Sequence, residues 1–356
     1  MPFTVTNAPA RATAPIWVLG NLQSNGHQGH NLLAYKLGQR GAKLAGWRDT
    51  RYQRILANVL RRLPAYRKLN PRTTYNLYRA NSLTRQSPGH VGLLHIIWGD
   101  YLIDRLAHPE RCVVTLHQPF ETWSDAVWAQ IGRCAGILCM AQREADEIQR
   151  RHPAVPAEFI AHGIDIDFWK PLPTPPKKQI CAVGRYMRNI DMMLRVARVL
   201  LREHADLSFR WLANPDFKLS PEMSQALPQE RFEVLRNLSP VELHRLYAES
   251  WLFCMPYDNV TASNAIVESM ASGTPVVTTR VGGMPSYSGR DAITMVGNND
   301  DVAMIAAVNR SLESLSQRNA QADRAREYAV NNFNWPVVSA AHEAFYARVL
   351  QACARA

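Results

Sequence analysis

The chain of 356 residues lacks several features that would assign it to a protein class at once. No apolar run approaches the ~18 residues of a membrane-spanning helix, and the N-terminal segment lacks the basic-then-apolar order of a secretion signal. The six cysteines form no CxxC pair and the 11 histidines include no HExxH motif, so no zinc chemistry is indicated. We therefore expect a cytoplasmic protein with buried free thiols, no bound metal and no cofactor.

Acidic residues are scarce in the first half of the chain. Residues 1–160 carry 20 Lys or Arg against 10 Asp or Glu, whereas residues 161–356 carry 21 against 20, so the first half holds nearly all of the net charge of +11. Within residues 36–85 there are 13 basic residues and one acid, Asp49. A basic field of this kind attracts phosphates, anionic lipids or nucleic acid. No nucleic-acid-binding module is recognisable, so no nucleic-acid partner is expected.

Residues 48–69 combine basic side chains with an apolar stripe at helical spacing. The stripe runs from Tyr52 to Leu63, and Arg51, Arg54, Arg61 and Arg62 lie beside or opposite it. One interpretation is a surface helix whose stripe packs into the core. The other is a basic amphipathic helix that lies on an anionic membrane with its stripe among the lipid head groups.

The hydrophobic content of 47% and charged content of 20% are those of a globular protein, and the length predicts two domains. Apolar runs at 15–20, 91–100 and 111–117 read as buried strands, and they alternate with helical segments, which favours α/β architecture. Four prolines between 171 and 176 predict a stiff linker. We expect a first domain over 1–170, a linker over 171–178, a second domain over 179–334 and a last helix over 335–356.

The stretch from Tyr257 to Tyr287 predicts a strand end, a polar loop, a short helix, a buried strand and a glycine turn. Ser263 or Asn264 is the expected N-cap, with a side-chain oxygen that accepts from the first-turn amides. A helix that starts at a strand's carboxyl end directs free N–H groups and its positive dipole end into the cleft, which suits a phosphate or diphosphate. Glu268, about one turn in, could accept from two ribose hydroxyls. The alternative is an ordinary α/β unit with a surface Glu.

This stretch resembles the signature of the retaining nucleotide-sugar glycosyltransferases of family four, which have the two-domain GT-B fold. Glu268 matches the second Glu of that signature, and Gly273, Pro275, Val276, Val277, Gly282 and Gly283 match the positions that follow. Val260 stands where the family has its first Glu. The role of that Glu would fall to Asp258, Thr261 or Ser263, or to backbone amides alone.

Other segments extend the resemblance and imply further site residues. Gly184-Arg185 matches the family's Gly-Arg, Arg188 stands where a Lys is usual, and both arginines are expected to hold the donor diphosphate and to stabilise the leaving group. His117, at a strand end, is expected beside the transferred sugar. The remaining expected donor-binding positions are Gly26 and Gly29 in the first glycine loop, Gly163 in HGID, Leu238 near the base, and Asn264, Ala265 and Ile266 at the helix start.

The resemblance implies two doubly wound Rossmann-like domains that face each other across a cleft, with a C-terminal helix that crosses back to the first domain. It implies metal-independent transfer of a sugar, with retention, from a nucleotide-sugar donor to a hydroxyl of a glycan or lipid-linked acceptor, in the synthesis of a cell-surface polysaccharide or glycolipid. The expected location is the cytoplasm, with peripheral binding to the inner face of the cell membrane through residues 48–69. A non-catalytic protein that binds a sugar nucleotide or a membrane surface is the alternative suggested by Val260, and an epimerase or phosphorylase of the same fold is a minor one.

Overall fold

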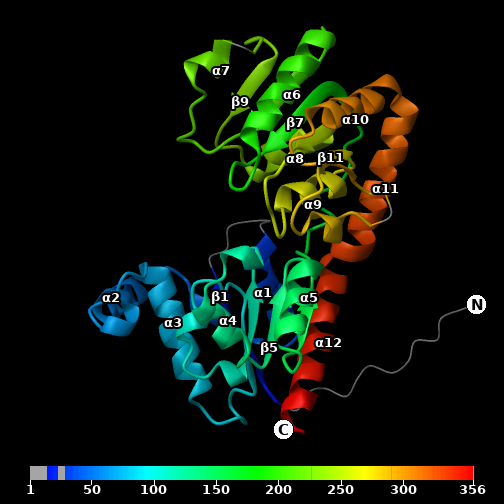
Figure 1. The fold of residues 1–356 in the computed structure, drawn as a ribbon. Helices are drawn as coiled ribbons and strands as arrows, with labels where there is room; N and C mark the ends of the chain where they lie inside the picture. Colours follow the sequence, from blue (N-terminus) through cyan, green and yellow to red (C-terminus); the bar gives the residue numbers. More distant parts are fainter. Residues whose placement is uncertain (1–13, 23–28, 226, 290, 356) are drawn as a thin grey trace, which may run out of the picture.

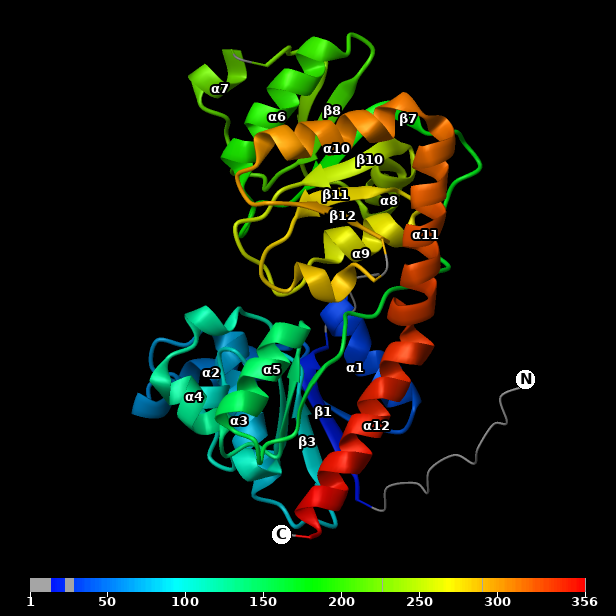
Figure 2. The same cartoon turned by 45° about the vertical axis from the view of Figure 1, so that its right-hand side comes forward.

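The computed structural model describes residues 14–22, 29–225, 227–289 and 291–355. Within them the chain forms two sheets of parallel strands, stacked one above the other with a long helical segment along one side (Figures 1 and 2). This architecture confirms the predicted pair of doubly wound α/β domains. The apolar runs predicted as strands are short and β-branched, as expected for strands covered on both faces.

The first sheet has the strand order β2-β1-β3-β4-β5-β6. Its strands are β1 (Ile16–Asn21), β2 (Lys43–Trp47), β3 (Leu93–Ile96), β4 (Cys112–Leu116), β5 (Gly136–Cys139) and β6 (Ala157–Phe159). The order runs in opposite directions from β1 and β3, which creates a switch point where ligands bind in open parallel sheets. Gly20 and Gly46 face each other in register, and a side chain on Gly46 would lie 1.9 Å from the Gly20 carbonyl oxygen.

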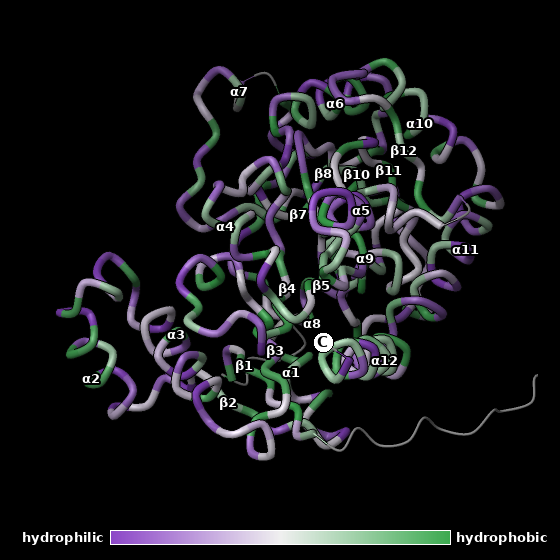
Figure 3. The backbone as a smooth tube through the Cα atoms, turned by 60° about the horizontal axis from the view of Figure 1, so that its bottom comes forward, coloured by the Kyte–Doolittle hydropathy of each residue, from purple (hydrophilic) through white to green (hydrophobic). Residues whose placement is uncertain are grey.

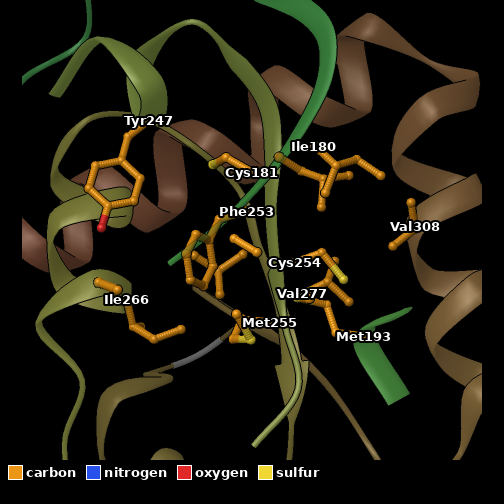
Figure 4. Close-up of a cluster of buried hydrophobic side chains, with 14 of the residues drawn as sticks. Ile180, Cys181, Met193, Tyr247, Phe253, Cys254, Met255, Ile266, Val277 and Val308 are labelled. Carbon is orange, nitrogen blue, oxygen red and sulfur yellow. The ribbon is translucent and has the colours of Figure 1, made fainter. Parts of the chain in front are cut away.

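The second sheet has the order β12-β11-β10-β7-β8-β9, with its switch point between β7 and β10. Its strands are β7 (Lys177–Val183), β8 (Ser208–Leu212), β9 (Phe232–Leu235), β10 (Ser250–Met255), β11 (Val276–Thr279) and β12 (Thr294–Val296). Figure 4 shows part of its core, where Phe253, Cys254 and Met255 of β10 pack between helical side chains on either face. Five of the six cysteines are buried free thiols, as predicted, and Cys353 is exposed.

Helices cover the faces of both sheets. In the first domain they are α1 (Gly29–Gln39), α2 (Arg51–Leu60), α3 (Pro71–Thr84), α4 (Asp125–Ile131) and α5 (Gln142–Arg151). In the second domain they are α6 (Ile190–Glu203), α7 (Pro221–Gln225), α8 (Pro240–Ala248), α9 (Asn264–Ala271), α10 (Asp301–Glu313) and α11 (Leu315–Phe333). The last helix, α12 (Trp335–Cys353), follows α11 directly.

Helix α12 returns to the first domain, as predicted, and runs along it in both views (Figures 1 and 2). Its apolar face, including Phe345 and Val349, packs with side chains of β1, β3 and α1 in one cluster. A buried polar contact lies within this interface: the Tyr346 hydroxyl is 2.6 Å from His95 Nδ1, and His95 Nε2 is 2.7 Å from the Thr115 hydroxyl.

The chain passes between the domains twice, and the two passages touch. The first lies between β6 and β7, and the second joins α11 to α12. The Ile164 amide donates to the Phe333 carbonyl at 2.7 Å, and Ile164 forms a bridge with Asn334. Gly163 is in contact with Trp335, where a methyl group on Gly163 would lie 2.3 Å from the indole.

Most of the apolar stripe of residues 48–69 lies outside the core, so the interpretation that the stripe packs inward holds only for its edge at Leu56 and Leu60, which are partly buried. Helix α2 ends at Leu60, and a 3-10 turn follows at Pro64–Tyr66. Tyr52, Ile55, Val59 and Leu63 are 70%, 56%, 53% and 51% exposed, whereas the adjoining side of the helix buries Gln53 and Ala57. The physical reason is that small and amide side chains allow this helix to approach its neighbours closely, which leaves the large apolar side chains outside.

Candidate active site in the interdomain cleft

A cavity of about 130 Å³ lies between the two domains, at the carboxyl ends of the strands of both sheets. The first domain contributes Trp98 and His117, which follow β3 and β4, and the second contributes Arg188 and Thr261, which follow β7 and β10. Because β7 and β10 flank the switch point of the second sheet, the cavity stands where such a sheet binds its ligand.

Helix α9 opens into this region without a side-chain cap. Ser263 occupies the N-cap position, but the prediction that its side chain caps the helix is wrong. Its hydroxyl instead lies 2.7 Å from the Tyr257 hydroxyl and 3.4 Å from Arg188 Nη2. The first-turn backbone of Asn264 and Ala265 therefore keeps the anion-binding character of an uncapped helix start. Ile266, predicted with them, is buried in the core of the second domain.

Arg188 is the cation that the structure brings to this helix start. Its guanidinium lies over the Tyr257 ring at 4.7 Å, and Nη1 donates to the Tyr186 carbonyl at 2.6 Å. Its Nε is buried and has no hydrogen-bond partner among the described residues. Gly184 has a φ of 90°, and a side chain there would lie 2.9 Å from Arg188 Nη2. A glycine at 184 therefore serves both the turn and the approach of the guanidinium.

Arg185 is placed at the margin of the site. Its side chain is exposed, and its guanidinium lies 5.0 Å from the centre of the Phe217 ring. It is not among the described residues that line the cavity. The predicted pair of cations is therefore divided, with Arg188 inside and Arg185 outside this closed cavity.

Glu268 lies in the middle of α9 and is 8% exposed. The Tyr247 hydroxyl donates to its Oε2 at 3.1 Å. Burial raises the pKa of this carboxyl from 4.5 to about 7. Because the side chain is buried, the alternative that Glu268 is an ordinary surface residue is wrong. Its carboxyl accepts one hydrogen bond from a hydroxyl and retains oxygen positions for further hydrogen bonds.

His117 is held rigidly on the opposite side of the cleft. Its amide donates to Asp100 Oδ1 at 3.0 Å, its Nδ1 lies 3.2 Å from Asp100 Oδ2, and its ring stacks on Trp98 at 4.1 Å. The His162 ring is stacked with the His117 ring at a centroid distance of 6.0 Å. Enclosure and the neighbouring His117 lower the pKa of His162 to about 3, so the His162 ring is neutral at physiological pH.

The remaining predicted positions are dispersed. Gly26 lies outside the described residues, and Gly29 is the first residue of α1. Gly163 packs against Trp335, and Leu238 packs on the core of the second domain. Packing alone accounts for Gly163 and Leu238 at these positions, and their donor-binding roles stay predictions.

Val260 stands where the family signature has its first Glu, and this apolar side chain also forms part of the cavity wall. Val260 is 3% exposed and lines the cavity. Of the three replacements considered, Thr261 lines the cavity, Ser263 contacts Arg188, and Asp258 has an exposed side chain that does not line it. The described walls of the cavity therefore contain no carboxylate.

The cleft is closed by direct contacts between the domains. The Thr261 hydroxyl donates to the His117 carbonyl, and the Tyr186 hydroxyl donates to Gln118 Oε1 at 2.9 Å. The Tyr287 hydroxyl donates to the Met140 carbonyl at 2.7 Å. Small-molecule sites usually enclose about 300–1,000 Å³, so a large ligand needs the domains to separate before it can enter.

Sequence reasoning missed Trp98, Gln118, Met140 and Tyr186, which all line the cavity. Trp98 follows the end of β3, and that position was the available signal, since strand ends of a parallel sheet converge on one edge. Tyr186 lies between the two predicted arginines. Its role depends on a contact with the other domain, which sequence spacing does not reveal.

Two features concern metals and membranes. Within residues 14–22, 29–225, 227–289 and 291–355, no group of three or more His, Cys, Asp or Glu is placed to hold a metal ion. In that same part of the chain, no helix combines the length and apolarity needed to cross a bilayer. Metal independence stays a prediction.

The chain has known relatives. Residues 177–314 match the family described as glycosyl transferases group 1. An MMP alpha-(1->4)-mannosyltransferase of Mycolicibacterium hassiacum is 24% identical over 222 residues, which cover 60% of this chain and 54% of that protein. A D-inositol 3-phosphate glycosyltransferase of Mycobacterium marinum is 28% identical over 237 residues, covering 60% and 50%. The chain spans about half the length of these curated relatives.

Solved structures resemble the chain over nearly its whole length. Sucrose-phosphate synthase from Thermosynechococcus elongatus superposes with a TM-score of 0.70 at 14% identity and covers 95% of this chain and 99% of its own. Anabaena Alr3699/HepE, solved with UDP and glucose, gives 0.67 at 14% identity and covers 94% and 100%. At this identity the likeness establishes the fold.

Proposed function

Because residues 177–314 form a glycosyl transferase group 1 domain within a two-domain GT-B fold, we propose that the protein transfers a sugar, with retention, from a nucleotide-sugar donor to a hydroxyl group. The acceptor is a glycan or a lipid-linked glycan of a cell-surface polysaccharide or glycolipid. No metal takes part, since Arg188 and the start of α9 provide the positive charge that the diphosphate requires. The cleft residue His117 supports the transferred sugar from the first domain.

One observation carries the proposal: the uncapped start of α9 lies beside the guanidinium of Arg188, whose Nε is buried without a hydrogen-bond partner among the described residues. The Ser263 hydroxyl, which would normally cap the helix, is engaged with Tyr257 and Arg188 instead. Backbone N–H groups and a guanidinium are donors that bind phosphate oxygens and stabilise charge on a leaving diphosphate. In this scheme Glu268 accepts hydrogen bonds from the ribose hydroxyls.

The first test is thermal stabilisation with UDP- and GDP-linked sugars, paired with slow hydrolysis of each ligand that stabilises. UDP-sugars belong in the panel because a structural neighbour holds UDP and glucose. A donor that stabilises the protein and is hydrolysed supports the transferase. Stabilisation without turnover, with or without acceptors, would instead favour a non-catalytic sugar-nucleotide-binding protein, for which Val260 offers a reason.

We further propose that the exposed face of α2 binds an anionic membrane surface. Ile55 and Val59 are more than half exposed and stand among arginines. A neighbouring cavity of about 530 Å³ is lined by Arg67, Lys68 and Arg105. Figures 1 and 3 show α2 at the outer edge of the first domain, away from the second. Apolar insertion with surrounding cations is the pattern of interfacial helices on anionic lipids.

Flotation of the full chain with vesicles tests this proposal. Binding to phosphatidylcholine vesicles that contain phosphatidylglycerol is expected at low salt, and less binding at high salt. The double variant Ile55→Ser/Val59→Ser should float less, whereas Val302→Ser, an exposed valine on α10 with 79% exposure, should float as the parent does. Equal flotation of all three proteins, or none, would remove the membrane proposal.

A further inference from the structure

The segment after β3 brings a carboxylate to the end of β4. The two strands pair in register, with Ile96 beside Val114. The Gly99 amide continues this pairing by donating to the Thr115 carbonyl at 3.0 Å, and a methyl group on Gly99 would lie 2.0 Å from a side-chain carbon of Val114. A glycine at 99 therefore permits the close approach that places Asp100 beside the turn after β4.

The carboxylate of Asp100 accepts hydrogen bonds from two consecutive backbone amides. Its Oδ1 lies 3.0 Å from the His117 amide nitrogen and 2.9 Å from that of Gln118, and its Oδ2 lies 3.1 Å from the His117 amide nitrogen. Only 4% of the Asp100 side chain is exposed, and it is not among the described residues that line the cleft cavity. Asp100 therefore acts on a ligand through His117 and Gln118 and not by contact.

The same carboxylate determines which nitrogen of the His117 ring carries a proton. Backbone N–H groups can only donate, so both oxygens of Asp100 act as acceptors. Oδ2 also lies 3.2 Å from His117 Nδ1, and this contact is a hydrogen bond when Nδ1 carries the proton. In a neutral imidazole one nitrogen donates and the other accepts. Nε2 is then the acceptor of the ring.

The neighbouring indole fixes the plane of the His117 ring. The rings of Trp98 and His117 stack at 4.1 Å with an angle of 16° between their planes. A ring held at one edge by a carboxylate and on one face by an indole cannot exchange its two nitrogens without losing its hydrogen bond. Because His117 lines the cavity, a ligand hydroxyl can donate to Nε2, whereas a phosphate oxygen, itself an acceptor, cannot.

The turn that Asp100 holds also contacts the second domain. The Thr261 hydroxyl donates to the His117 carbonyl, and the Tyr186 hydroxyl donates to Gln118 Oε1 at 2.9 Å. Both acceptors belong to residues whose backbone amides are bound to Asp100. One buried carboxylate therefore fixes the His117 ring and the place where this turn meets the other domain.

We propose that Asp100 is a positioning residue for sugar transfer, which holds His117 with the proton on Nδ1 so that the ring accepts a hydrogen bond from a sugar hydroxyl. The cavity then has two unlike ends: donors to the diphosphate at Arg188 and the start of α9, and an acceptor at His117. This difference orients the nucleotide sugar. The role in transfer rests on the proposed function, whereas the state of the ring does not depend on it.

Long-range 1H–15N NMR of the histidine rings in the full chain, without ligand, measures the position of the proton. At about pH 8, where an ordinary histidine is neutral, the signal that His117→Asn removes should be that of a ring protonated on Nδ1. Asp100→Asn places an amide donor where an acceptor oxygen stood, and it should move the proton to Nε2. Asp104→Asn, the same change at an exposed site on the next turn, should leave it on Nδ1. A parent ring protonated on Nε2 would overturn the proposal, and that result requires no variant to fold.

The kinetics of donor hydrolysis test the consequence for transfer. Asp100→Asn should lower kcat about tenfold to hundredfold, the loss expected when a supporting side chain no longer holds a site residue in place. KM should change less, because the contacts with the diphosphate remain. Asp104→Asn should match the parent, and thermal transitions confirm that the variants compared are folded.

The two measurements separate this inference from the proposed function. A proton on Nδ1 that Asp100→Asn displaces, in a protein that hydrolyses no donor, would support the assignment of the ring and overturn the transferase. Donor hydrolysis with a kcat that a folded Asp100→Asn variant leaves unchanged would overturn the positioning role and retain the transferase.

Discussion

At the scale of single residues, the hydroxyl of Ser263 decides what α9 can bind. A serine at the N-cap usually accepts from a first-turn amide, but here Tyr257 and Arg188 hold it in another direction. The same contact that leaves the helix start open also positions a cation beside it. The Ser263 side chain therefore affects both parts of the proposed anion site, the open start of α9 and the guanidinium beside it.

Replacement of Arg188 by Ala should reduce donor turnover at least about tenfold, which corresponds to ~1.4 kcal/mol of transition-state stabilisation. The reason is that its guanidinium lies beside the open start of α9, where it would pair with the charge of the diphosphate. Arg185→Ala should cost less, because Arg185 is exposed beside Phe217. Steady-state kinetics measure both, and Arg202→Ala, on the outer surface of α6, is the control. An unaltered kcat/KM in the Arg188 variant would contradict the assignment.

Glu268 should make the protein less stable as the pH rises. The pKa of Glu268 is about 7 in the folded protein, against 4.5 for a solvent-exposed Glu. Between these pH values the folded protein therefore binds more protons than the unfolded one. The free energy of unfolding then falls from pH 4.5 through pH 7. Glu268→Gln removes this titration and should flatten the fall, by roughly 3 kcal/mol at most. Thermal transitions between pH 5 and 8 measure it, and parallel curves for both proteins would show that the group does not contribute.

At the scale of secondary-structure elements, α12 is fixed to the first domain by a buried histidine pair. His95 Nδ1 lies 2.6 Å from the Tyr346 hydroxyl of α12, and the centres of the His95 and His342 rings are 5.7 Å apart. Burial lowers the pKa of His342 to about 4 and that of His95 well below 6.5. The ring of His95, on β3, and the ring of His342, on α12, are therefore both neutral in the folded protein near neutral pH.

Acid should therefore loosen this helix. As the pH falls from 6.5 to about 4, the unfolded state takes up protons that the buried rings do not, so the free energy of unfolding falls. His342→Asn should reduce that dependence and leave the stability near pH 8 closer to the parent. Chemical denaturation at several pH values measures it, with His108→Asn, whose side chain is 40% exposed, as the control. An acid limb equally steep in both variants would contradict this role.

The sequence predicts secondary-structure elements well where the apolar periodicity and the Gly or Pro residues that end an element agree. Gly273 and Pro275 mark the end of α9, and the β-branched run after them marks β11, so this unit was predicted in place. Helix α3 and strand β2 were missed, because neither carries a strong apolar run. The direction of the α2 stripe was open, since periodicity shows that one face differs from the other but not which face the fold covers.

At the scale of the whole molecule, the described structure is a closed one. A cavity of about 130 Å³ leaves little space for a nucleotide sugar, and hydrogen bonds of Thr261 and Tyr186 hold the two domains together. Site prediction from sequence reaches its limit here. Contacts such as Tyr186 with Gln118 join residues 68 positions apart and depend on how the domains meet, not on any local pattern.

The double variant Thr261→Val/Tyr186→Phe should shift the protein toward an open arrangement. Each lost hydrogen bond is worth about 0.5–1.5 kcal/mol, so the open population should rise severalfold. Small-angle X-ray scattering should show a larger radius of gyration than for the parent or for Tyr328→Phe on α11. Identical scattering from all three would indicate that other contacts control closure.

The two passages of the chain between the domains lie side by side, joined through Ile164 and Phe333, with Gly163 set against Trp335. The two connections therefore form one hinge at one side of the cleft. A domain that rotates about this hinge moves least beside it and most at the far side of the cleft. A side chain added at Gly163 would meet the Trp335 indole, and a displacement there would be largest at the far side of the cleft.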